Sequence, residues 1–138
     1  MRPQVVISGP LFLLVAGGLF AAGAEPTTSA ERTRFFETEI QPILQAHCIS
    51  CHGGEKTRSG LNLTSREGLL KGGERGPAVS LDKPDDSLLL KAVNQHDELK
   101  MPPKGKLAQA QIDTLARWVR MGAPWSEGTS ARRHGPPP

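Results

Sequence analysis

Both cysteines of this 138-residue chain lie three positions apart, in the segment HCISCHGG that runs from His47 to Gly54. A histidine, His52, directly follows the second cysteine. Thiolates and imidazoles bind metals, and paired cysteines exchange with disulfides, so this segment holds the residues of the chain best suited to chemistry.

A disulfide, a redox-active dithiol and a zinc site each explain the pattern poorly. A disulfide between Cys48 and Cys51 would close a four-residue ring, which constrains the unfolded chain very little. A thioredoxin-like dithiol follows a β-strand in a βαβ unit, whereas helical spacing precedes this pair. A zinc site needs four ligands in a tetrahedron, and no second pair of Cys or His follows nearby.

The fourth chemistry accounts for every residue of the pattern, because Cys-x-x-Cys-His is the attachment sequence of c-type haem. On a helical turn, residues at i and i+3 lie on one side, so both sulfurs can bond to the vinyl groups of a single haem. His52 then lies under the iron. The sequence therefore predicts one haem c per chain, with thioether bonds to Cys48 and Cys51 and with His52 as the proximal iron ligand.

The expected distal iron ligand is Met101. It lies in the loop segment KMPPKGKL, where Pro102 and Pro103 hold it in an extended conformation. A thioether on a rigid loop can approach the iron from the face opposite His52, and His/Met ligation is known in cytochromes c. The alternative ligand is His96, five residues earlier.

The other histidines and methionines of the mature chain are weaker candidates. Met121 lies at the end of a helical pattern beside Trp118, so we expect it to fill the core. His47 adjoins an attached cysteine and cannot reach the other face of the haem. His134 lies in the C-terminal tail.

Residues 1–24 have the features of a secretory signal peptide. Arg2 precedes a mostly apolar run from Val5 to Phe20, and small residues at 22–24 fit a cleavage site after Ala24. The alternative is an uncleaved membrane anchor over residues 5–24, long enough to span a bilayer. Either way we expect the domain to be periplasmic or otherwise exported, with membrane contact only if the leader stays attached.

Charge and composition exclude some functions and favour a cofactor. Beyond residue 24 there are 16 Lys and Arg against 14 Asp and Glu, with the signs interspersed, which does not favour nucleic-acid binding. The chain has four Phe, two Trp and no Tyr. Such a thin core in a small domain predicts that a large apolar group supplies the missing volume.

The pattern of apolar residues predicts short helices separated by loops. After a polar linker at 25–30, apolar spacing predicts a helix from residue 31 to 47 that is kinked or divided at Gln41–Pro42. Residues 53–83 hold seven of the fifteen glycines and predict an ordered loop that approaches a flat ligand closely, with one helical turn opened by Ser65. Capping-type residues before Leu88 open a short helix.

The last predicted helix carries Ile112, Leu115 and Val119 on one face. It ends at Gly122 and Pro124, and Ala108 is a poor N-cap for it. The folded domain is thus expected over residues 31–125, with a disordered tail at 126–138.

The order of these motifs resembles the planctomycete-type cytochrome c domain. The likeness extends from about Arg34 to Trp125 through the segments EIQPILQAHCISCHGGEKTRSGLNLTSREGLLKGGERGPAV, PDDSLLLKAV, KMPPKGKL and LARWVRMGAPW. It implies an all-α cytochrome c-like fold, with about three to five short helices and Gly-rich loops wrapped around one covalent haem ligated by His52 and Met101. Ala108 departs from the family, which usually has Ser or Thr there.

The resemblance favours an electron carrier rather than an enzyme, because filled axial positions leave the iron no open site. Lys100, Lys104 and Lys106 flank the ligand loop and are expected to attract an acidic redox partner. Two alternatives stay open: a haem enzyme or gas sensor in which Met101 dissociates, and a haem module of a larger exported protein, since this domain usually opens a much longer chain.

Overall fold

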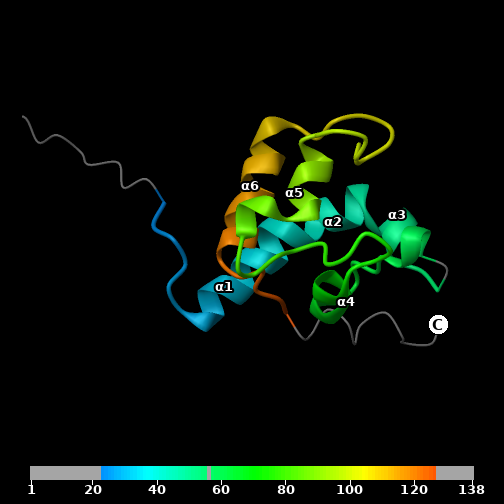
Figure 1. The fold of residues 1–138 in the computed structure, drawn as a ribbon. Coiled ribbons are helices and arrows are strands. Elements are labelled where there is room, and N and C mark those ends of the chain that lie inside the picture. Colours follow the sequence, from blue (N-terminus) through cyan, green and yellow to red (C-terminus); the bar gives the residue numbers. More distant parts are fainter. Residues whose placement is uncertain (1–22, 56, 127–138) are drawn as a thin grey trace, which may run out of the picture.

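We describe residues 23–55 and 57–126 in a computed structural model of the chain (Figure 1). This part is helical and contains no β-strand, only an isolated bridge between Gly73 and Gly76. The α-helices are α1 (Ser29–Phe35), α2 (Gln41–His47), α3 (Ile49–His52), α4 (Arg66–Lys71), α5 (Leu88–Val93) and α6 (Gln109–Arg120), with a π-helical turn η1 (Phe36–Ile40) and 3-10 turns η2 (Arg58–Gly60) and η3 (Pro84–Asp86). The all-α prediction is confirmed.

The first helix runs without a break from α1 through η1 to α2. Pro42 lacks an amide proton, and the wider turn of η1, in which the Gln41 N–H donates to the Phe36 carbonyl, lies directly before it. The expected effect of Pro42 is therefore seen as a π-turn directly before it, but the helix is continuous and is not divided at Gln41–Pro42.

The first helix begins at Ser29, so Ser29 and Ala30 belong to it and not to the linker predicted from the sequence. The cause is a capping box: Thr28 Oγ1 accepts from the Glu31 N–H at 3.2 Å, and Glu31 Oε2 accepts from the Thr28 N–H at 2.9 Å. These hydrogen bonds, with others from Thr27, lower the pKa of the exposed Glu31 carboxyl to about 2.

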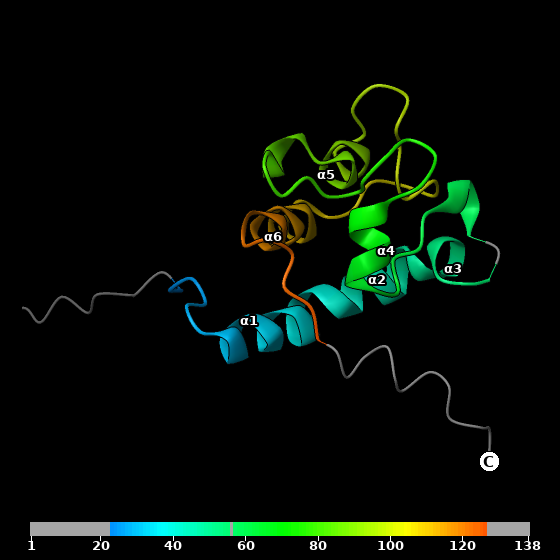
Figure 2. The same ribbon diagram turned by 60° about the horizontal axis from the view of Figure 1, so that its bottom comes forward.

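The core lies between the first helix, α5 and α6 (Figure 2). Its largest side chains form an aromatic cluster in which Phe36 packs 4.3 Å from Trp125 and 6.0 Å from Trp118, between ring centroids. The fully buried Trp118 donates its indole N–H to the Pro124 carbonyl at 2.8 Å. Ser126 is also buried and its hydroxyl bonds to Glu37, so the packed unit extends one residue beyond its predicted end.

The N-termini of α4, α5 and α6 show which of the predicted N-caps form. Ser65 accepts from the Gly68 N–H at 3.0 Å, as predicted for the turn that it opens. Ala108 gives α6 no side-chain cap, although the Ala108 N–H reaches Gln111 Oε1 at 3.3 Å. Ser87 does not cap α5, because its buried hydroxyl accepts instead from the Ser80 N–H.

Arg66 joins the start of α4 to the end of α6. Its guanidinium donates to the carbonyls of Ala123 at 3.0 Å and Gly122 at 2.9 Å, which belong to the turn that ends α6. Because α4 lies in the long glycine-rich segment, this contact fixes that segment to the helical core.

Arg66→Ala is expected to lower the free energy of unfolding by about 1.5–3 kcal/mol, since two charge-assisted hydrogen bonds are lost and two carbonyls are left unpaired. Urea denaturation of the haem-loaded protein measures this change. Arg34→Ala, at an exposed position on α1, is the matched control and should stay within about 0.5 kcal/mol. Equal effects of the two variants would contradict the structural role of Arg66.

None of the helices in residues 23–55 and 57–126 has the length and apolar character needed to span a bilayer. The predicted signal peptide lies almost entirely outside these residues, as does the predicted tail beyond Ser126.

Candidate haem site

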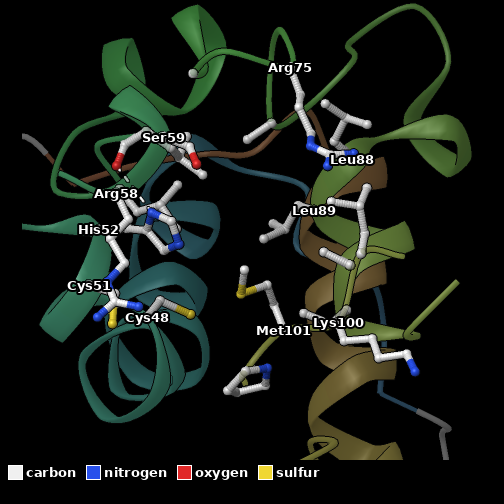
Figure 3. Close-up of a pocket in the computed structure, with 18 of the residues that line it drawn as sticks. Cys48, Cys51, His52, Arg58, Ser59, Arg75, Leu88, Leu89, Lys100 and Met101 are labelled. Carbon is white, nitrogen blue, oxygen red and sulfur yellow. Dashed lines mark hydrogen bonds between the residues drawn. The ribbon is translucent and has the colours of Figure 1, made fainter. Parts of the chain in front are cut away.

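A cavity of about 420 Å³ lies between the α3 side of the fold and the α5 side (Figure 3). Its volume falls within the range of about 300–1,000 Å³ typical of small-molecule and cofactor sites. Most of its lining is apolar, including Leu61, Leu63, Leu89, Val93 and Leu107. It is the kind of space that a large apolar group would fill.

One wall of the cavity carries all three residues of the Cys-x-x-Cys-His pattern. The single turn of α3 brings them together, with both the Cys51 and the His52 N–H donating to the Cys48 carbonyl, at 3.2 and 2.9 Å. Cys48, Cys51 and His52 all line the cavity. The three residues that the sequence pattern groups together therefore share one wall of the cavity.

The two cysteines are free thiols in this structure, not a disulfide. Burial raises the pKa of the Cys48 thiol to about 11, so at neutral pH it is protonated. A redox-active dithiol needs the opposite, a thiol whose pKa is lowered. This environment disfavours the redox alternative.

The imidazole of His52 is oriented by the backbone of the following loop. Its Nδ1 lies 3.3 Å from the Leu61 carbonyl oxygen, and the Leu63 N–H donates to the His52 carbonyl at 2.7 Å. With the proton on Nδ1, this contact leaves Nε2 as the free ligand atom, and Figure 3 shows the ring directed into the cavity. Backbone partners of this kind orient metal-binding histidines.

Met101 enters the cavity from the opposite wall. Its N–H donates to the Ala92 carbonyl in α5 at 3.0 Å, and its peptide bond to Pro102 is cis. Figure 3 shows the thioether pointing across the cavity toward the His52 side. The two residues predicted to flank the iron thus face one cavity from two separate elements.

One of the weaker candidates, His47, also lines the cavity. His96 is exposed and does not line the cavity, whereas His47 lines it at the end of α2, on the wall that carries the cysteines. Met121 packs against the hydrophobic core, as predicted. His134 is outside the described residues.

The glycines of the long loop serve chiefly to let backbone segments meet. A Cβ atom on Gly73 would lie 2.3 Å from the Ser59 carbonyl oxygen, and one on Gly68 would lie 2.2 Å from that of Asn62. Close approach of this loop to a flat ligand, as expected from the sequence, stays a prediction. Gly73 and Gly76 do line the cavity, but the crowding at Gly73 comes from the facing loop.

Two arginines in the lining, Arg58 and Arg75, were not singled out from the sequence. Their positions depend on how η2 and the turn at residues 73–76 meet in space, and no spacing pattern in the sequence reports that meeting. In residues 23–55 and 57–126, no three His, Cys, Asp or Glu side chains gather as a metal-binding group.

The profile of the planctomycete cytochrome c family matches residues 48–105. Residues 48–105 are a planctomycete cytochrome c domain. The match begins at Cys48, includes His52 and Met101, and so covers both walls of the cavity. No curated protein and no solved structure matches the chain significantly.

The residues of this cytochrome c domain fit the haem that its family implies. Two free thiols, an imidazole with one nitrogen already engaged by backbone, and a thioether all face one apolar cavity. That donor set is the one used to attach and ligate haem c. The domain therefore belongs to a c-type haem protein.

Proposed function

We propose that this domain is a single-electron carrier in which His52 and Met101 are the axial ligands of one covalently bound haem. The observation that carries the proposal is the placement of these two side chains on opposite walls of one cavity. Haem supplies an iron that alternates between ferric and ferrous states.

The protein contributes orientation, exclusion of water and control of the ligand field. The Leu61 carbonyl holds the His52 ring in one orientation, and the apolar side chains of the cavity keep water from the ligands. The hydrogen bond from the Met101 N–H to α5 anchors the ligand loop. A thioether ligand favours the reduced state and raises the potential, which suits a carrier.

The optical spectrum of the holoprotein tests this proposal. A six-coordinate, low-spin oxidised form with the far-red sulfur-to-iron band is expected. A high-spin, five-coordinate spectrum would favour the alternative of a haem enzyme or gas sensor, in which the iron has an open position.

We also propose export to the periplasm or beyond, directed by residues 1–24, because haem is attached to Cys-x-x-Cys-His outside the cytoplasm. An uncleaved leader would instead anchor the domain to a membrane. The domain would act either as a free carrier or as the haem module of a larger exported protein.

A docking surface for an acidic redox partner is proposed on the Met101 loop. Lys100, Lys104 and Lys106 are exposed there, and Figure 3 shows Lys100 directed away from the cavity. Three ion pairs occur in the described residues, and none involves these lysines. Their charges are therefore available to steer an anionic partner toward the haem edge.

Reversing these charges is expected to slow electron exchange with anions. The triple variant Lys100→Glu, Lys104→Glu, Lys106→Glu should react with ferrocyanide about tenfold more slowly at low salt, and the difference should shrink at high salt. Stopped-flow absorbance measures both rates. Lys71→Glu on α4 is the exposed single-charge control. If the triple variant were slowed by no more than the cube of the factor measured for Lys71→Glu, a localised docking surface would be refuted.

A further inference from the structure

We propose that Arg75 binds a propionate carboxylate of the haem, at the end of the cavity opposite the two cysteines. This inference rests on the proposed haem site. It assigns a task to a cavity residue that neither the attachment pattern nor the axial ligands explain.

The first argument is position. Figure 3 shows the guanidinium of Arg75 at one end of the cavity and the sulfurs of Cys48 and Cys51 at the other. The vinyl groups of haem, to which cysteines bond, are on one half of the porphyrin, and both propionates are on the other half. Attachment at Cys48 and Cys51 therefore directs the propionates toward the Arg75 end.

The second argument is that the backbone turn which carries the exposed Arg75 side chain is held in place before any ligand arrives. It belongs to a tight turn in which the Gly73 N–H donates to the Gly76 carbonyl at 3.2 Å and the Gly76 N–H donates back at 3.0 Å. The Glu74 N–H fixes this turn to η2 by donating to the Ser59 carbonyl at 2.9 Å. A backbone anchored in this way reduces the entropy lost when the side chain binds.

The third argument is charge. The other cations of the lining are turned elsewhere, since Figure 3 shows Lys100 pointing away from the cavity and Arg58 extending toward the cysteine end. None of the three ion pairs in the described residues includes Arg75, and its neighbour Glu74 does not pair with it. A carboxylate brought into a largely apolar cavity needs a charged partner, and guanidinium binds carboxylate through two parallel hydrogen bonds.

The test uses the full-length, haem-loaded protein and compares Arg75→Gln with Arg75→Lys. Resonance Raman spectroscopy reports hydrogen bonding to the propionates through their bending band. Equilibration with a redox dye at one fixed potential gives the ratio of reduced to oxidised haem. Arg34→Gln, at an exposed position on α1, is the matched control.

Arg75→Gln should shift the propionate band to lower frequency and reduce the ratio of reduced to oxidised haem about three- to tenfold, because a cation that favours the reduced haem is lost. Arg75→Lys keeps the charge but not the paired hydrogen bonds, so it should shift the band and largely restore the ratio. If Arg75→Gln yields no holoprotein, the propionate band of Arg75→Lys still tests whether Arg75 binds the propionate.

A propionate band unchanged in both Arg75 variants would overturn the assignment, and so would an equal shift in Arg34→Gln. These outcomes are separate from failure of the proposed function. If the wild-type protein carried no covalent haem, the proposed function would fail before any Arg75 variant was measured.

Discussion

Met101→Ala is expected to abolish the far-red sulfur-to-iron band of the oxidised protein and to lower its midpoint potential by on the order of 0.1 V or more, within the range of about 0.8 V that axial ligands cover. The physical reason is that a thioether stabilises ferrous iron and no other thioether lines the cavity in the described residues. Absorption spectroscopy and spectroelectrochemical titration measure the two effects.

Met121→Ala is the matched control for this prediction. Met121 is also a half-buried methionine, but it packs against the hydrophobic core and does not line the cavity. Its loss should reduce stability and leave the band intact. If the band survived in Met101→Ala, another sulfur would be the sixth ligand, and the assignment of Met101 would be wrong.

The double variant Cys48→Ala, Cys51→Ala is expected to lose all covalent haem and most of its folded structure. Without thioether bonds, no haem stain should remain on a denaturing gel, whereas each single variant keeps one possible bond. Ser50→Ala, between the cysteines in α3 and exposed, is the control and should stain as strongly as wild type.

The loss of structure follows from the size of the cavity. At about 24 cal/mol per Å³, emptying a cavity of about 420 Å³ costs up to on the order of 10 kcal/mol, and less where it opens to solvent. That is comparable to the whole stability of a small domain, about 5–15 kcal/mol. Far-UV circular dichroism of the double variant should therefore show much less helix. Full wild-type helicity without haem would contradict this reasoning.

Local features of the fold could be predicted from the sequence because their causes are local. Pro42 disturbs the helix that contains it, Ser65 caps a turn three residues ahead, and the apolar face of α6 repeats within one helix. The start at Ser29 was missed because the capping function of Thr28 requires Glu31 to turn back toward it.

Contacts between distant segments could not be predicted in this way. Arg66 meets the end of α6 at a separation of 56 and 57 residues, and Ser126 meets Glu37 across 89. No periodicity links such pairs, because they depend on how the helices pack. The same holds for Arg75, which enters the cavity only because the turn at 73–76 rests on η2.

The same distinction, between features with local causes and features that depend on how distant segments pack, applies to the candidate site. Cys48, Cys51 and His52 are predicted site residues because of their spacing, which one helical turn converts into a shared surface. Met101 was proposed from its proline-rich loop, and the cavity places it opposite His52. The Leu61 carbonyl that orients His52 carries no side-chain signal, so only the folded backbone reveals it.

Mass spectrometry of the full chain, produced with the haem-attachment machinery and digested with trypsin, tests the central claim most directly. The account predicts that the peptide from Phe35 to Lys56, which contains both cysteines, carries the mass of one haem. The same peptide found with two free thiols, or with those thiols oxidised to a disulfide, would contradict it.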